Sequence, residues 1–169
     1  MKILTFGEIM LRLKTPDHLR IVQTDGFEAS YGGAESNVAV SLATLGDDAA
    51  FVTKLPKNPV GDAAFNELRR YGVDTSRILR GGPRLGIYYF EKGSDIRPTN
   101  VLYDRAGSAL AEAAANEFDW ETLLSGVGIF FFSGVTPAIS DSVEQAVLGA
   151  LKYCHAHGIT VICDLNYRA

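Results

Sequence analysis

The chain has 169 residues, 16 of them basic and 20 acidic, and a formal net charge of −4. Hydrophobic residues make up 47% of it and charged residues 21%, as in a globular protein with one substantial core. No block of like charge occurs, which argues against binding to nucleic acid or a membrane surface. The amino-terminal apolar run is too short for a signal peptide and no transmembrane segment follows, so we expect a cytoplasmic protein without a membrane partner.

The first part of the chain predicts a strand, a small β excursion and a helix. Residues 2–6 form a short apolar run typical of a central strand. Residues 10–14 alternate apolar and polar, as in a half-exposed antiparallel strand, with 27–31 as its partner. After a Gly-Gly pair that ends at Gly33, apolar spacings of three and four predict a helix capped by Gly46. Free amides in its first turn can hold a polar ligand, although the glycines alone also fit a simple turn.

The middle of the chain predicts a second helix and a hairpin. A strand is expected at 49–54, a helix from Pro59 to Tyr71, and a short strand around 78–79. Residues 84–91 and 100–105 alternate aromatic and polar side chains, which is typical of a hairpin in a sheet open to solvent on one side. With the early excursion, this hairpin predicts about four antiparallel strands outside the main sheet.

The last part of the chain predicts a βαβ unit. High helix propensity predicts a helix at 108–116, and a shorter helix follows at 120–124. The apolar run 127–133 predicts a strand buried on both faces, the amphipathic stretch 140–157 a helix, and 159–163 a second buried strand. The expected fold class is therefore α/β, with a mainly parallel sheet flanked by helices. Because α/β proteins collect functional groups just past strand ends, where this chain stops, we expect it to be the first part of a longer protein.

The cysteines and histidines indicate no metal site. Cys154 lies on an apolar helical pattern and Cys163 on an apolar strand pattern, so we expect two buried thiols of a cytosolic protein rather than a disulfide. His155 and His157 are too few and too close in sequence for a closed zinc site.

Several separate segments resemble signature regions of the ribokinase-like (PfkB) carbohydrate kinases. Gly32-Gly33-Ala34 with Asn37 and Gly46 resembles the family's N-terminal signature, and the stretch from Lys57 to Asp74 resembles its second region. Within the family, the segments that look most like 2-keto-3-deoxygluconate kinase are 7–10, 33–37, 103–105 and 164–168. The resemblance covers essentially the whole chain, and the family's domains, of about 300 residues, are roughly twice as long.

This resemblance implies a fold, a reaction and an assembly. Residues 1–169 would be the N-terminal part of one ribokinase-like domain whose C-terminal part is missing, with lid strands at about 9–31 and 84–105 inserted in the α/β core. The full-length enzyme would use ATP and Mg²⁺ to phosphorylate a small sugar acid, 2-keto-3-deoxygluconate, to its 6-phosphate. It would be a homo-oligomer paired through the β lid.

The resemblance also implies the site residues. Those expected to bind substrate are Gly33, Ala34, Asn37, Tyr89, Tyr103, Arg105 and Arg168, and Asn166 is expected to bind the cofactor. Their chemistry suits a sugar acid, because an asparagine can serve hydroxyls, arginines can hold a carboxylate, and a glycine lets a ligand approach the backbone. Structural alternatives stay open: Tyr89 as a cross-strand packing residue, and Arg105 and Arg168 as ordinary surface residues.

Two departures from the family pattern limit these expectations. Asp104 stands where the family's sugar-acid kinases commonly have an aromatic residue, which leaves the exact sugar open. The Gly-Ala-Gly-Asp motif that carries the family's catalytic base is absent, so the catalytic residue is expected beyond residue 169 and the chain alone is expected to be inactive. The alternatives are a fructose or ribose type of kinase and a non-catalytic sugar-acid-binding module. A dinucleotide-binding domain is disfavoured because Gly-x-Gly-x-x-Gly does not follow the first strand.

Overall fold

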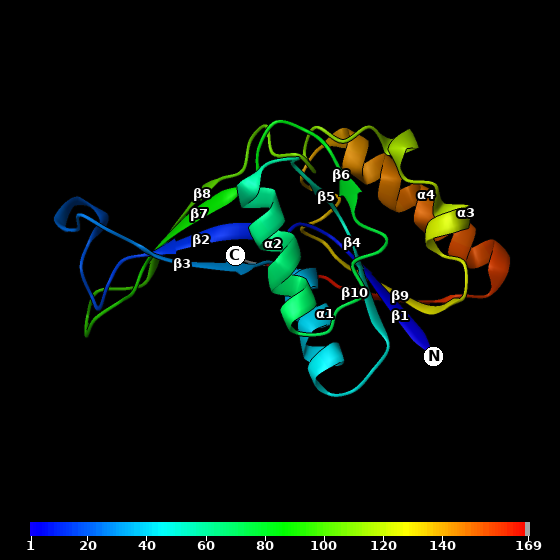
Figure 1. Ribbon diagram of the computed structural model, residues 1–169, viewed down its shortest axis with the longest axis horizontal. Helices are drawn as coiled ribbons and strands as arrows, with labels where there is room; N and C mark the ends of the chain where they lie inside the picture. Colours follow the sequence, from blue (N-terminus) through cyan, green and yellow to red (C-terminus); the bar gives the residue numbers. More distant parts are fainter. Residues whose placement is uncertain (168–169) are drawn as a thin grey trace.

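The computed structural model describes residues 1–167 as a core sheet and a second sheet that projects from it (Figure 1). The core sheet has the strand order β10-β9-β1-β4, and each neighbouring pair is parallel. Its strands are β1 (Lys2–Phe6), β4 (Ala49–Val52), β9 (Val127–Ser133) and β10 (Thr160–Asp164). The expected α/β class with a mainly parallel sheet is confirmed.

Helices cover both faces of the core sheet (Figure 1). The helical segments are η1 (Ile21–Gln23), α1 (Ala34–Thr44), α2 (Pro59–Arg70), η2 (Ala115–Glu117), α3 (Trp120–Leu123) and α4 (Asp141–His157). The two faces follow from strand alternation: Val52 of β4 packs in the cluster under α3 and α4, whereas its neighbour Phe51 packs with residues of α1 and α2. Within residues 1–167, none of these helices is both long and apolar enough to cross a membrane.

The two longer predicted helices begin and end at recognisable signals. Asn58 caps α2 by accepting a hydrogen bond from the amide of Gly61 at 2.9 Å, and Pro59 occupies the first position. Ser140 caps α4, and Gly158 ends it in the left-handed conformation with φ 68°. The apolar face expected for α4 is buried at Val143, Ala146, Val147, Ala150 and Cys154.

The second sheet is built from two hairpins and has the order β3-β2-β7-β8. Its strands are β2 (Met10–Lys14), β3 (Glu28–Gly32), β7 (Ile87–Glu91) and β8 (Asn100–Asp104). The pairs β2–β3 and β7–β8 are antiparallel, but β2 and β7 run parallel. The expectation of four antiparallel strands is therefore wrong at the centre of this sheet, because the first strand of each hairpin runs outward from the core. A small parallel pair, β5 (Lys54–Leu55) with β6 (Leu79–Arg80), lies beside the core sheet.

The helix expected at 108–116 is absent, and turns lead into η2 instead. Two carbonyl oxygens of this segment accept hydrogen bonds from hydroxyls at the start of α4: Ala111 from Ser140 at 2.9 Å and Ala113 from Ser142 at 2.7 Å. Tertiary contacts thus replace the helical ladder, and the alanine-rich propensity is overridden.

The last strand is more exposed than its apolar sequence predicts. All five residues of β10 are exposed, and Cys163 with them, because β10 is an edge of the core sheet in the described chain. The expectation of two buried thiols is wrong for Cys163, whereas Cys154 is buried; both are free. Its neighbour β9 is also only half-buried at Ile129 and Phe131, so the expectation of burial on both faces is wrong there.

Candidate functional site

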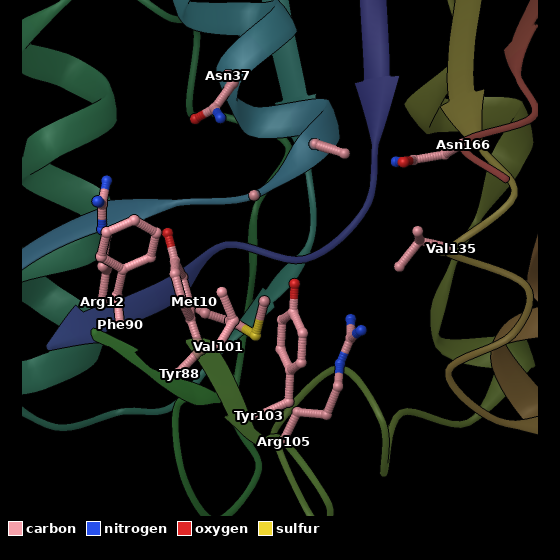
Figure 2. A pocket seen from close by; sticks show the side chains of 12 residues that line it. Met10, Arg12, Asn37, Tyr88, Phe90, Val101, Tyr103, Arg105, Val135 and Asn166 are labelled. Atoms are coloured by element: carbon pink, nitrogen blue, oxygen red, sulfur yellow. The ribbon is translucent and has the colours of Figure 1, made fainter. Parts of the chain in front are cut away.

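A cavity of about 460 Å³ opens where the second sheet meets the start of α1 and the carboxyl ends of the core strands (Figure 2). It is lined by Met10, Arg12, Gly33, Ala34, Asn37, Tyr88, Phe90, Val101, Tyr103, Arg105, Val135 and Asn166. An apolar wall with a few polar groups is typical of small-molecule sites. Its place at the carboxyl edge of a parallel sheet is where α/β folds bind ligands.

Most of the residues expected in the site come together in this cavity. Those that line it are Gly33, Ala34, Asn37, Tyr103, Arg105 and Asn166. Tyr89 does not line it, and Arg168 lies outside the described residues. Asn166, expected to contact a cofactor, therefore lines the same cavity as residues expected to contact the substrate.

The strand register explains why Tyr88 replaces Tyr89 in the cavity. Tyr88 is paired with Tyr103 across β7 and β8, and their rings lie 5.9 Å apart between centroids. Tyr89 points to the opposite face of the sheet, where its ring packs 5.8 Å from that of Phe27. The expectation for Tyr89 is corrected to the packing alternative. Tyr103 and Arg105 are two residues apart and therefore lie on one face of the strand. With the hairpin register known, that face would have indicated Tyr88, which pairs with Tyr103.

Gly33 is needed for a contact with the protein's own backbone. A Cβ atom added at Gly33 would lie 1.9 Å from the carbonyl oxygen of Glu8. Its φ of −177° is ordinary extended backbone, so sterics alone favour glycine here. The close approach that we expected a substrate to make is made by Glu8, and Gly33 contributes to the cavity wall beside it.

Arg105 enters the cavity already paired with a buried carboxylate. Its Nε and Nη2 atoms donate to Oε2 of Glu8 at 2.9 and 2.5 Å. The hydroxyl of Ser108 donates to the other oxygen of Glu8 at 2.6 Å, and the Glu8 side chain is only 5% exposed. Because Glu8 lies just after β1, this ion pair ties the second sheet to the core. It also offsets the positive charge that Arg105 brings to the cavity.

Asp104, the departure from the family pattern, does not line the cavity. Its carboxylate accepts two hydrogen bonds from Arg84, at 2.8 and 2.9 Å. The hydrogen bonds from Arg84 lower the pKa of Asp104. Alternation along the strand explains this position, because Tyr103 and Arg105 face the cavity and the residue between them faces away.

A second buried carboxylate, Glu35, holds the start of α1 in place. One of its oxygens accepts from the amide and hydroxyl of Ser133, at 3.0 and 2.6 Å, and from the hydroxyl of Thr136 at 2.6 Å. The Ser133 hydroxyl is also 3.5 Å from the side-chain nitrogen of Asn166. Glu35 therefore connects the helix that carries Asn37 to the loop behind Asn166. Nothing local in the sequence marks a first-turn glutamate as buried, so this role could not be predicted from it.

The phenol of Tyr88 is a hydrogen-bond donor at neutral pH. Burial raises its pKa, Tyr103 adds to that shift, and the positive charge of Arg12 opposes it. Residues 1–167 contain no group of three or more His, Cys, Asp or Glu side chains able to hold a metal ion. The chemistry of the cavity is thus that of neutral hydroxyl and amide groups between two guanidinium groups.

Comparison with known proteins finds a family match over the whole chain. The description "pfkB family carbohydrate kinase" matches residues 1–169. A 2-dehydro-3-deoxygalactonokinase from Haloferax volcanii is 39% identical over 168 residues, covering 99% of this chain and 52% of that protein.

Solved structures agree with this match. The crystal structure of a 2-dehydro-3-deoxygluconokinase from Thermotoga maritima has a TM-score of 0.97 and 56% identity, covering 99% of this chain and 52% of that one. A fructokinase from Xylella fastidiosa, solved with bound ATP, has a TM-score of 0.82 and 25% identity, again over 99% of this chain and 52% of that one. The chain thus spans about half the length of these proteins.

Proposed function

We propose that this chain forms the substrate-binding half of a sugar-acid kinase, since it belongs to the pfkB family of carbohydrate kinases. The reaction is ATP-dependent phosphorylation of 2-keto-3-deoxygluconate at its terminal hydroxyl, giving the 6-phosphate. The similar proteins from Haloferax volcanii and Thermotoga maritima are named for 2-dehydro-3-deoxy sugar acids, which supports an acid of this class.

The observation that carries this proposal is the cavity at the junction of the two sheets. Its volume of about 460 Å³ suits a ligand of sugar size. The amide of Asn37 and the phenols of Tyr88 and Tyr103 can exchange hydrogen bonds with several hydroxyls. The residues of this chain therefore bind and orient the acceptor sugar, and the second sheet shields it from water.

ATP would supply the phosphoryl group, with Mg²⁺ as its usual companion. The described chain offers Asn166 as a contact on the side of the cavity nearest β9, and it holds no carboxylate cluster for a metal. Gly-x-Gly-Asp is absent from the sequence, so we assign no catalytic base to this chain. What these residues supply is acceptor binding and orientation.

A fusion protein provides the test. This chain joined to the remaining half of the Thermotoga maritima enzyme should phosphorylate 2-keto-3-deoxygluconate in an assay coupled to ADP release. The 169-residue chain alone should show no turnover, because it lacks the Gly-x-Gly-Asp segment expected to carry the catalytic base. Turnover by the isolated chain, or a fusion that is folded but prefers neutral sugars, would contradict the proposal.

The runner-up is a kinase for a neutral sugar of the fructose type. One observation favours it: Glu8 offsets the charge of Arg105, which lowers the attraction of that end of the cavity for an anion. The fructokinase from Xylella fastidiosa is a similar protein with that kind of substrate name. A fusion that uses fructose or ribose at least as well as the sugar acid would establish this alternative.

We also propose that the second sheet acts as a lid and as a pairing surface between two copies of the protein. Phe27 and Leu102 are exposed on it, at 39% and 56%. Exposed apolar side chains beside open strand edges favour association with another sheet.

Both cysteines are free thiols, which is compatible with the cytoplasmic location that we expect.

A further inference from the structure

Arg12 is a second arginine that lines the cavity. It lies on β2, and its guanidinium stands 4.1 Å from the centre of the Phe90 ring on the neighbouring strand. Figure 2 shows Arg12 and Phe90 at one side of the cavity, and Arg105 and Asn166 at the other. The cavity thus has one arginine at each side.

The two arginines differ in whether the protein already neutralises them. Arg105 is bound to Glu8 through two nitrogens. The Nε atom of Arg12 is buried without a hydrogen-bond partner, and within residues 1–167 its side chain enters no ion pair. A buried donor without an acceptor is unfavourable, so the unpartnered Nε–H of a guanidinium in a ligand cavity points to an anionic ligand group.

An acidic side chain on a neighbouring element, Glu67, does not change this. Glu67 of α2 lines a smaller adjoining cavity together with Arg12. Its carboxylate, however, forms its ion pair with Arg70 at 3.7 Å. Of the described residues that line the main cavity, those beside Arg12, namely Met10, Tyr88 and Phe90, are uncharged.

From this we infer that Arg12 binds the carboxylate of the substrate and so makes the site selective for sugar acids. The inference rests on the proposed function, which it deepens. Stacking on Phe90 holds the guanidinium plane, so its fork can present two parallel N–H groups to a carboxylate. The acid then lies with its carboxylate at Arg12 and its hydroxyl tail toward Arg105 and Asn166. That orientation places the terminal hydroxyl near the carboxyl ends of the core strands.

The test is calorimetric titration of the 169-residue chain with two sugars. One is 2-keto-3-deoxygluconate, and the other is 3-deoxyfructose, its neutral counterpart with an alcohol in place of the carboxylate. Arg12→Met should weaken binding of the acid about 10- to 100-fold, as expected for a lost charged hydrogen-bond pair, and change binding of the neutral sugar less than about 2-fold. Arg12→Lys should recover part of the loss, because a lysine keeps the charge but not the fork.

Arg69→Met is the matched control. Arg69 also stacks on a phenylalanine, 5.9 Å from the ring of Phe65, but it lies on α2 outside the cavity. This variant should bind both sugars like the parent chain. An equal loss in Arg69→Met would show a general effect of charge and overturn the assignment.

The outcomes separate the inference from the proposed function. If the parent chain prefers the acid and Arg12→Met prefers it as strongly, Arg12 is not the carboxylate group, while the sugar-acid proposal stands. If the parent chain binds both sugars equally or neither, the sugar-acid proposal itself fails. Should Arg12→Met not fold, the Nε–H resonance of Arg12 in arginine-labelled parent chain decides: it should shift with the acid and not with the neutral sugar. An unchanged resonance during acid binding would overturn the inference.

Discussion

At the scale of single residues, the face of the sheet on which a hairpin side chain lies decides whether it can contact a ligand in the cavity. Tyr88 and Tyr89 are adjacent and chemically identical, yet only Tyr88 lines the cavity. Tyr89 contributes its ring to the opposite face, against Phe27. The pair is therefore a natural internal control for the position of the site.

Replacing each tyrosine by phenylalanine should separate these roles. Tyr88→Phe removes a hydroxyl from the cavity and should weaken sugar binding about 5-fold, the effect of one lost hydrogen bond of about 1 kcal/mol. Tyr89→Phe keeps the ring that packs on Phe27 and should leave affinity unchanged. Titration of both variants with the same sugar measures the difference. A loss in Tyr89→Phe alone would place the site on the other face, and equal losses would contradict the separate roles of the two tyrosines.

A second residue-scale prediction concerns Asp74 and acid stability. Burial disfavours its charge, but hydrogen bonds from Lys2 at 2.7 Å and from the amide of Ser76 outweigh that effect and lower its pKa from 3.8 to about 2. Because the folded pKa lies below the unfolded one, the stabilisation is present above about pH 4 and is lost as the pH falls toward 2. Unfolding free energy should drop by up to about 2 kcal/mol over that window.

Urea unfolding between pH 5 and pH 2 measures this dependence. Lys2→Met removes a hydrogen bond that lowers the pKa of Asp74. The unfolding free energy of this variant should therefore fall less steeply as the pH is lowered. Lys14→Met is the control, because Lys14 pairs with Glu28 on the second sheet and does not contact Asp74. An equal fall in unfolding free energy between pH 5 and pH 2 in Lys2→Met and in the parent chain would refute the assignment.

At the scale of elements, the start of α1 is the junction on which the site depends. It presents Ala34 and Asn37 to the cavity. It is held on one side by the hydrogen bonds of Glu35 to Ser133 and Thr136, and on the other by contact between Gly33 and the Glu8 backbone. Glu8 in turn binds Arg105, so the helix, the core sheet and the second sheet meet within one connected set of contacts.

Gly33→Ala tests this junction. The added Cβ would lie 1.9 Å from the carbonyl oxygen of Glu8, so backbone must move, and we expect destabilisation of about 1–3 kcal/mol as for other overpacked sites. Sugar binding should weaken as well, because α1 moves relative to the second sheet. Thermal unfolding and titration report the two effects.

Gly26→Ala provides the comparison for that variant. No atom lies within 4 Å of a Cβ added at Gly26. Its melting temperature should stay the same or rise slightly, since alanine restricts the unfolded chain. Similar melting temperatures for the two variants would show that the contact with Glu8 does not hold the junction.

At the scale of the whole molecule, the second sheet projects from the core (Figure 1). Phe27 and Leu102 are exposed apolar residues of this part of the chain. If two copies pair through it, Leu102→Glu should shift the chain to monomers in light scattering after size exclusion. Leu45 is more exposed, at 80% against 56%, but lies at the end of α1. Leu45→Glu should therefore leave the assembly unchanged. A monomeric parent chain, or equal effects of both changes, would refute pairing through this sheet.

The sequence by itself determined the α/β class, the order of the longer strands and helices apart from the helix expected at 108–116, and half of the residues that line the cavity. These follow from local signals: the caps of α2 and α4, the apolar face of α4, and the Gly-Gly pair before α1. Family resemblance added Tyr103, Arg105 and Asn166, which the fold brings to one cavity.

Only the tertiary structure decided the rest, because those features depend on partners distant in the chain. The register of β7 against β8 chose Tyr88 over Tyr89, and hydroxyls of α4 replaced the helix expected at 108–116. The edge position of β10 exposed Cys163, which its apolar neighbours had suggested was buried. Glu8 pairs with Arg105, which lies 97 residues further along the chain. Among residues 1–167, the Nε atom of the other cavity arginine, Arg12, has no hydrogen-bond acceptor.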